Sequence, residues 1–379
     1  MKKLLLATAA AAVMGQAALA EGHAVKVGVL LGYTGPIESL TPPMADSAEL
    51  AMQEVSDSGN FLGGMAIEPV RADSTCVDAA AATAAAEPLE LYVANNVAVP
   101  NGVVMVSPSA TSPALSTIDD NGLFFRTAPS DARQGEVLAN ILMDREITEV
   151  AVTYTNNDYG KGLSDSFIQS YEALGGEITI NAAHEDGKGD YSAEVGALAA
   201  AGGDLLVVLG YADQGGVGII RSAVDTGAFD QFALGDGMYS QTLIDAIGPD
   251  LEGTIGSVPW SEGEGADAFA DVANAAGVDP TSTFTRESYD AAALIAMAMQ
   301  AGGEATREAV AANLMDVANA PGEKIMPGEL GKALQILADG GDVDYVGATN
   351  VELIGPGEAA GTYREYIVQD GAYETVTFR

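Results

Sequence analysis

The chain has 379 residues, of which 54 are acidic and 16 are basic, so its formal net charge is −38 at pH 7. A surface this acidic repels nucleic acid and anionic lipid headgroups, and we expect neither as a partner. One cysteine and two histidines give too few ligands for a His/Cys zinc site, and no EF-hand loop is present. We therefore expect no metal and no cofactor, although counting leaves carboxylate-only sites open. The length exceeds what one core usually serves, which predicts two domains.

Residues 1–20 have the pattern of a secretory signal peptide. The chain starts Met1-Lys2-Lys3, continues with a short apolar run, and reaches Ala18-Leu19-Ala20 just before Glu21. No later segment offers the ~20 unbroken apolar residues of a membrane helix. We therefore expect a protein that is exported to the periplasm and does not insert into a membrane.

The first part of the remaining chain alternates strand and helix patterns. Strands are predicted at 25–31, 66–71 and 103–106, and helices at 45–55, 77–87 and 89–99. Such alternation indicates βαβ units and a parallel sheet.

The same alternation returns further along the chain and then changes. Strands are predicted at 149–154, 178–182, 204–210 and 231–234, with helices at 161–174, 192–201 and 214–226. Helices follow at 285–301, 304–315 and 328–338, and a β-hairpin turns at Asp370-Gly371 between 363–369 and 373–378. The pattern predicts an α/β protein with a second doubly wound domain.

The stretch 103–113, V-V-M-V-S-P-S-A-T-S-P, reads as a buried strand that ends in a loop of small residues. In open α/β sheets, ligands bind just beyond the carboxyl ends of the strands. This loop offers backbone N–H groups and the hydroxyls of Ser109 and Thr111 to a small polar ligand. A plain strand-to-helix turn, with Ser or Thr as the N-cap, explains the same residues.

Four short motifs occur together in the chain. They are T-G-P at 34–36, S-P-S-A-T-S-P at 107–113, F-R-T-A-P-S-D at 125–131 and D-Y-G-K-G at 158–162. With the leader and the length, they make the chain resemble the periplasmic solute-binding proteins of the branched-chain amino acid ABC-transporter type, over nearly the whole mature chain. The resemblance implies an α/β fold of two doubly wound parallel-sheet lobes, joined by three hinge crossings, with the ligand cleft between them.

The resemblance also implies where each lobe lies in the sequence. Lobe one is expected at 24–126 plus 261–349, and lobe two at 127–260 plus 350–379. Members of this family hold an amino acid by its zwitterionic head. The ligand-binding residues implied here are Ser109, Ala110, Thr111, Tyr159, Tyr211 and Asp236.

In this arrangement the small-residue loop meets the ligand's carboxylate and part of its ammonium, the two tyrosines line the lobe-two wall, and Asp236 pairs with the ammonium. The chemistry is sound, because a carboxylate taken from water needs several donors and a buried ammonium needs a fixed anion. Plainer readings stay open. Asp236 between glycines is also a turn residue, Tyr211 also caps a core, and Tyr159 also suits an exposed turn. Trp260, near a predicted crossing, favours hinge packing over ligand contact.

The chain departs from the family in two places. Leu40 stands where many relatives carry an aromatic residue, so the pocket roof stays apolar but loses a flat face. The family also has a further strand, with a cysteine and a ligand-touching serine, where the helices at 77–87 and 89–99 nearly abut. Roughly 20 residues are missing there, about one strand with its turns. Cys76 then lacks its usual disulfide partner, and we expect it to be a free thiol.

Several functions fit these observations to different degrees. A receptor that captures a branched-chain or similar amino acid and delivers it to the permease of an ABC importer, as a monomer, is the first hypothesis. The same fold also serves for amides, urea or aromatic acids, or as a soluble sensor module. An enzyme is not expected, because the chain has no G-x-S-x-G elbow, P-loop, H-E-x-x-H or G-x-G-x-x-G motif.

Overall fold

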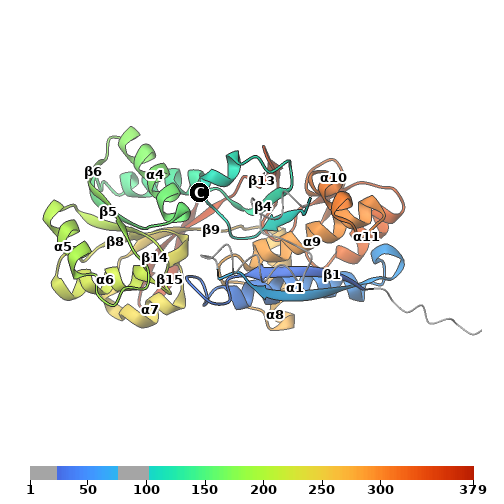
Figure 1. Cartoon of the computed structure of the whole chain (residues 1–379), viewed down its shortest axis with the longest axis horizontal. Helices are drawn as coiled ribbons and strands as arrows, with labels where there is room; N and C mark the ends of the chain where they lie inside the picture. The colour runs from blue at the N-terminus through green and yellow to red at the C-terminus, as the bar shows by residue number, and fades with distance from the viewer. Residues whose placement is uncertain (1–23, 76–101) are drawn as a thin grey trace, which may run out of the picture.

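A computed structural model describes residues 24–75 and 102–379 of the chain. The predicted signal peptide, Cys76 and the predicted helices at 77–87 and 89–99 lie outside these residues. The described chain forms two lobes that lie end to end along the long axis of the molecule (Figure 1). The predicted fold class, two α/β lobes with parallel sheets, is confirmed.

Lobe two is built on one seven-stranded sheet with the order β15-β14-β9-β8-β7-β5-β6. The strands from β9 to β6 run parallel, and the C-terminal hairpin adds two antiparallel strands beside β9. The strands are β5 (Glu149–Thr155), β6 (Glu177–His184), β7 (Leu205–Leu209), β8 (Phe232–Leu234), β9 (Ile255–Pro259), β14 (Tyr363–Gln369) and β15 (Ala372–Phe378).

Helices cover both faces of this sheet. The apolar sequence of the central strand β7 explains why both faces need a helical layer. All five residues of β7 are buried. Leu206 and Val208 pack into a core with α5, α6 and α7, whereas Leu205, Val207 and Leu209 pack into another core with α3 and α4. Alternate residues of a strand point to opposite faces, so an unbroken apolar run needs a helical layer on each side. The helices are α3 (Asp131–Asp144), α4 (Asp158–Ala173), α5 (Ser192–Ala201), α6 (Gly215–Thr226) and α7 (Gln241–Ile247).

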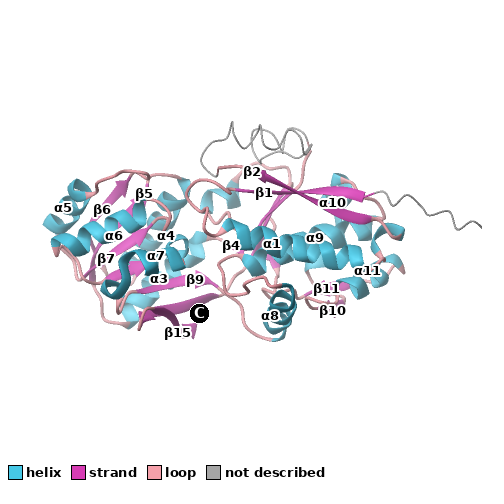
Figure 2. Cartoon of the chain, turned by 90° about the horizontal axis from the view of Figure 1, so that it is seen from below, coloured by secondary structure: helices cyan, strands magenta, loops and turns pink. Residues whose placement is uncertain are grey.

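Lobe one is organised around two long helices, α1 and α9, which pack on each other and share one core with α10 and α11 (Figure 2). Its helices are α1 (Thr41–Asp57), α8 (Glu264–Ala276), α9 (Thr285–Gly302), α10 (Arg307–Ala318) and α11 (Leu330–Ala338). Its strands are β1 (Ala24–Leu31), β2 (Ala66–Asp73), β3 (Met105–Ser107), β4 (Phe124–Pro129), β10 (Glu323–Ile325), β11 (Val343–Tyr345), β12 (Leu353–Ile354) and β13 (Glu358–Ala359).

The strands of lobe one form separate small sheets. Within the described ranges, β1 pairs with β2 alone, while β3 belongs to a sheet with the order β12-β13-β4-β3. A cavity of about 300 Å³ lies between β1 and β3, lined by backbone and side chains of both strands and by residues of α9 and α10. The expected single doubly wound sheet is therefore divided in this lobe, between its first and third strands.

Over residues 24–75 and 102–379, the chain passes between the lobes in three places: from β4 into α3, from β9 into α8, and from β13 into β14. The pairing of β13 with β4 keeps 353–359 beside the lobe-one strands. The lobe bounds stay a prediction, and this pairing leads us to propose that the third crossing lies at 360–362 rather than at the predicted 349–350.

Several boundaries differ from the sequence pattern. Helix α1 starts four residues earlier than predicted, at Thr41, with prolines in its first turn, where a missing N–H costs no hydrogen bond. Helix α4 starts at Asp158 rather than at 161, because the Asn157 side chain accepts from the N–H of Gly160 and caps it.

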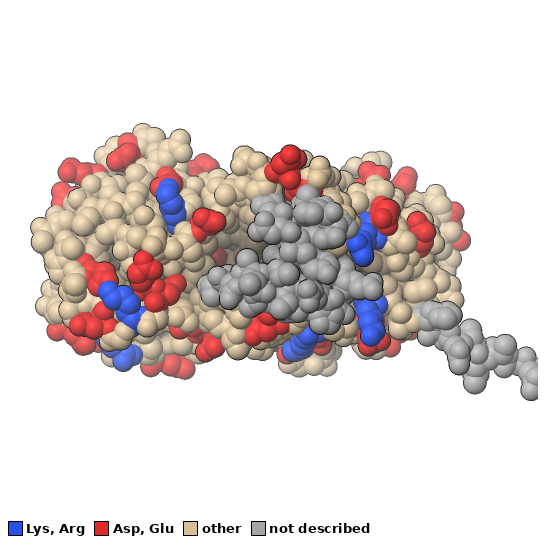
Figure 3. Space-filling view, viewed as in Figure 1, with Lys and Arg blue, Asp and Glu red and all other residues tan. Residues whose placement is uncertain are grey.

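Within the described ranges, no helix combines the length and apolar character of a membrane span. Acidic side chains are spread over both lobes of the visible face (Figure 3).

Candidate ligand-binding site

A cavity of about 310 Å³ lies between the two lobes. Lobe one contributes the β1–α1 loop, the loop after β3 and Phe284, and lobe two contributes side chains that follow β5, β7 and β8. The structure brings all the predicted site residues to this one cavity: Ser109, Ala110, Thr111, Tyr159, Tyr211 and Asp236. Their roles toward a ligand stay a prediction.

The loop after β3 is held in shape by its own side chains. Ser107 accepts a hydrogen bond at its hydroxyl from the N–H of Ala110, at 3.0 Å. Ser112 is the N-cap of the short 3₁₀ helix that follows and accepts from the N–H of Ala114. The same stretch therefore serves both as an N-cap and as a wall of the cavity. Ser112 caps the 3₁₀ helix, while Thr111 before it is 97% buried and lines the cavity.

Arg126, in β4, anchors this loop from behind. Its guanidinium is 1% exposed and donates to the carbonyls of Ala110 and Ser112, each at 3.0 Å, and to the hydroxyl of Ser116 at 2.8 Å. It also pairs with the carboxylate of Glu358, which lies in β13. In the sequence this arginine is visible only as part of the 125–131 motif. Its signal is a lone arginine in an otherwise apolar strand pattern, F-F-R-T-A.

The lobe-two wall is a stacked pair of tyrosines. Tyr159 lies in the first turn of α4 and Tyr211 follows β7, and their ring centroids are 5.1 Å apart with 27° between the planes. Asn157, the cap of α4, also donates its side-chain N–H to the hydroxyl of Tyr211 at 3.3 Å. Asn157 thus caps the helix that carries Tyr159 and also holds the Tyr211 hydroxyl. The two rings present a flat face with polar edges to the cavity.

Asp236 is buried, with 3% of its surface exposed. The hydroxyl of Tyr159 donates to its Oδ1 at 2.9 Å and accepts from the N–H of Gly237 at 3.2 Å. Burial raises the pKa of the Asp236 carboxyl, while the Tyr159 hydroxyl and nearby backbone N–H groups lower it. The following glycine is required by close packing, since a Cβ on Gly237 would lie 2.5 Å from the carbonyl oxygen of Gly210.

The remaining wall comes from lobe one and is mainly apolar, with Ser74 and Ser107 as polar members. Leu40 lines it, as expected, and is 7% exposed. Phe284, which precedes α9, also lines it and supplies an aromatic face that the sequence analysis missed. The other apolar residues of this wall are Leu30, Leu31, Pro36, Ile37, Met44, Met105 and Leu115. A hydrophobic side chain of moderate size fits such a surface.

The lobes contact each other directly around this cavity. The N–H of Ser39 donates to the carboxylate of Asp213 at 2.8 Å, and the hydroxyl of Ser112 donates to the carbonyl of Asp158 at 3.3 Å. Each bond joins a lobe-one loop to a lobe-two loop. The two lobes are therefore in direct contact beside the cavity.

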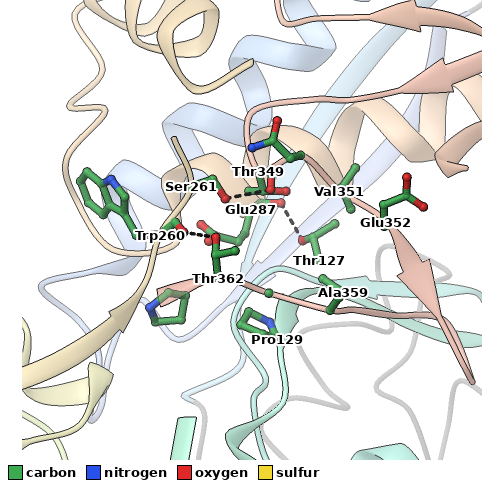
Figure 4. A pocket seen from close by; sticks show the side chains of 14 residues that line it. Thr127, Pro129, Trp260, Ser261, Glu287, Thr349, Val351, Glu352, Ala359 and Thr362 are labelled. Carbon is green, nitrogen blue, oxygen red and sulfur yellow. Dashed lines mark hydrogen bonds between the residues drawn. The ribbon is translucent and has the colours of Figure 1, made fainter. Parts of the chain in front are cut away.

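A second, smaller cavity of about 30 Å³ lies at the hinge (Figure 4). Trp260 lies beside it, with the guanidinium carbons of Arg286 and Arg364 at 3.9 and 4.0 Å from its ring centroid. Glu287 points into the same region, and burial raises its pKa to about 7. The space holds about two waters, too little for an amino acid. Trp260 packs at the hinge and does not line the larger cavity.

Comparison with known proteins identifies the family. A model of a periplasmic binding protein family matches residues 24–332, most of the chain. The chain belongs to the periplasmic binding protein family. The resemblance inferred from the motifs is therefore confirmed, and this is a family of solute-binding proteins rather than of enzymes.

Individual members agree with this assignment. A "Leu/Ile/Val-binding protein homolog 1" from Brucella melitensis is 29% identical over 325 residues, which cover 81% of this chain and 85% of the relative. The leucine-binding protein LivK from Thermotoga maritima shares the fold with a TM-score of 0.77 at 22% identity, covering 93% of this chain and 98% of that protein. LivJ from Streptococcus pneumoniae, solved with isoleucine, gives 0.75 at 21% identity, covering 94% and 99%.

Proposed function

We propose that the protein is the periplasmic receptor of an ABC importer, and that it captures a branched-chain or similar amino acid in the interlobe cavity. The observation that supports this most is the polarity of the cavity. The hydroxyl-bearing loop 109–111 lies on one side, the Asp236 carboxylate lies on another, and apolar residues form most of the remaining wall.

The division matches the three parts of a small apolar amino acid. Its carboxylate is satisfied by the hydroxyls of Ser109 and Thr111, because the N–H of Ala110 already donates to the Ser107 hydroxyl. Its ammonium pairs with Asp236, which also accepts from the Tyr159 hydroxyl at Oδ1. Its side chain lies against the wall that includes Leu40 and Phe284. A plain carboxylic acid or urea leaves the Asp236 charge without a partner inside a closed cavity, which is costly.

The finer expectations go with this proposal. The signal peptide at 1–20 directs the protein to the periplasm, and the mature receptor works as a monomer that docks on the permease. It binds and releases its ligand unchanged, without enzymatic chemistry. Because the cavity is walled by both lobes, ligand stabilises the closed arrangement by the difference between its affinities for the closed and open states.

The test is calorimetry with Leu, Ile, Val, Thr and Ala, with benzoate, urea and acetamide as comparison ligands. We expect tight binding of at least one aliphatic amino acid and weaker binding of all three comparison ligands. Asp236→Ala should weaken it by about 2–5 kcal/mol, since it leaves the ammonium buried without its anion. Asp236→Asn keeps an acceptor for Tyr159 and should lose less.

The matched control is Asp225→Ala, which removes a carboxylate from the exposed face of α6 and should leave affinity unchanged. If the folded Asp236→Ala variant binds within about threefold of the unaltered protein, under 1 kcal/mol, the carboxylate does not hold the ammonium. Preferred binding of benzoate, urea or acetamide would refute the amino-acid assignment itself.

A further inference from the structure

Asp131 is a buried acid directly behind the ligand loop. It is the first residue of α3, and its backbone N–H donates to the carbonyl of Thr111 at 2.9 Å. Its side chain has no exposed surface and does not line the ligand cavity. Neither of its carboxylate oxygens has a hydrogen-bond partner of good geometry among the described residues, although the Thr111 hydroxyl lies close enough to lower its pKa. A carboxylate buried in this way is costly when it is charged.

The surroundings of Asp131 favour its neutral form. Burial raises its pKa well above the usual range, the nearby Asp236 carboxylate raises it further, and Thr111 and Arg126 lower it. The start of a helix also favours a negative charge, but burial is the largest effect here. Arg126 is already engaged by Glu358 and by the loop carbonyls.

The neighbouring acid differs in a way that decides which of the two carries a proton. Asp236 receives the Tyr159 hydroxyl as a donor at 2.9 Å, and backbone N–H groups lower its pKa. Asp131 has only the Thr111 hydroxyl as a donor nearby. Two adjacent buried carboxyls do not both ionise readily, and the one with more donors ionises first. The other titratable or charged groups that interact with the pair are Tyr159, Tyr363, Tyr366 and Arg126.

The protonation of Asp131 determines what Thr111 can offer to a ligand. A hydroxyl has one proton to donate and two lone pairs. An ionised Asp131 only accepts, so it takes the Thr111 proton and leaves lone pairs toward the cavity. A neutral Asp131 donates to the Thr111 oxygen and leaves the hydroxyl proton free for a carboxylate in the cavity.

We propose that Asp131 is a positioning residue that stays protonated behind Thr111 and directs the Thr111 hydroxyl proton at the ligand's carboxylate. This inference rests on the proposed function for the identity of the ligand. The protonation of Asp131 does not depend on which ligand binds, so the protonation state and the ligand are tested in separate experiments.

The first experiment uses the protein without ligand. Infrared difference spectra at neutral pH, unaltered protein minus Asp131→Asn, should show the carbonyl band of one protonated carboxyl group. The difference against Asp225→Asn, an exposed acid, should show none. An ionised-carboxylate band in the Asp131→Asn difference overturns the proposal, whatever the protein binds.

The second experiment measures affinity for the amino acid that binds tightest. Asp131→Asn keeps a donor toward Thr111 and should bind within about threefold of the unaltered protein at pH 7. Asp131→Ala keeps none and should bind at least about tenfold more weakly. Equal, tenfold losses in both variants show that the ionised form is needed, and no loss in Asp131→Ala shows that no positioning occurs. Either result overturns the proposal.

The pH dependence of ligand affinity separates positioning by a protonated Asp131 from a purely structural role of this residue. The ratio of the Asp131→Asn affinity to the unaltered affinity should stay constant or rise between pH 6 and 9, because only the unaltered residue can ionise. Loss of the ligand's own ammonium proton affects both proteins equally and cancels in the ratio. A ratio that falls as pH rises would show that the ionised carboxylate binds better.

Discussion

Replacing Arg126 by methionine tests how the ligand loop is held. The variant removes a guanidinium that is 1% exposed, with its bonds to the carbonyls of Ala110 and Ser112 and its pair with Glu358. Breaking a buried pair by removing one partner typically costs about 3–5 kcal/mol, since the other charge is left alone. The Glu358 side chain is 19% exposed, so water relieves part of that cost, and we expect a loss of about 3 kcal/mol.

Urea unfolding of the ligand-free protein measures this loss. The matched control is Arg133→Met, because Arg133 forms an exposed pair with Glu136 and should cost less than about 1 kcal/mol. The double variant Arg126→Met/Glu358→Leu should regain stability relative to Arg126→Met, because no unpaired charge remains. Ligand affinity should fall in both variants that lack Arg126, since the loop carbonyls lose their anchor. A stability loss under about 1 kcal/mol, or unchanged affinity, would refute this account of the loop.

Two further predictions concern the hinge and lobe one. Burial raises the pKa of Glu287 from 4.5 to about 7, so the folded protein holds this proton more tightly than the unfolded chain. The stability it gives is present in acid and lost as pH rises from 4.5 through 7, at most about 3 kcal/mol. Urea unfolding at pH 5 and pH 8 should show a smaller pH effect in Glu287→Gln, and equal effects would contradict the assignment. In hydrogen exchange, β1 and β3 amides should exchange faster than those of β7, which pairs on both sides. Equal protection would show that the divided sheet costs lobe one nothing.

The parts of this molecule that the sequence predicts are those with local signals. The apolar run at 204–210 requires two helical layers wherever it occurs, and β7 has them. The small-residue loop after β3 and the polar residues after β5, β7 and β8 follow from one rule about strand ends. That rule places each group at the carboxyl edge of its own lobe's sheet, and the cavity lies between these two edges.

The parts that were missed depend on partners far away in the chain. Arg126 acts through Glu358, 232 positions later, and no pattern around either residue announces the other. Phe284 reaches the cavity from the segment before α9, where the sequence reads only as the approach to a helix. Strands such as β12 and β13 are two residues long, too short to carry an alternating pattern.

The divided sheet of lobe one explains why the anchor matters. Within the described ranges, β3 pairs with β4 over three residues and has no bond to β1, so the β1 side does not fix the loop that follows β3. The loop is instead held from the β4 side, by strand pairing and by the Arg126 guanidinium on its carbonyls. In this arrangement the β1–β2 pair can be locally less stable without displacing Thr111. The backbone N–H of Asp131, just after β4, donates to the carbonyl of Thr111 and ties the start of α3 to the same loop.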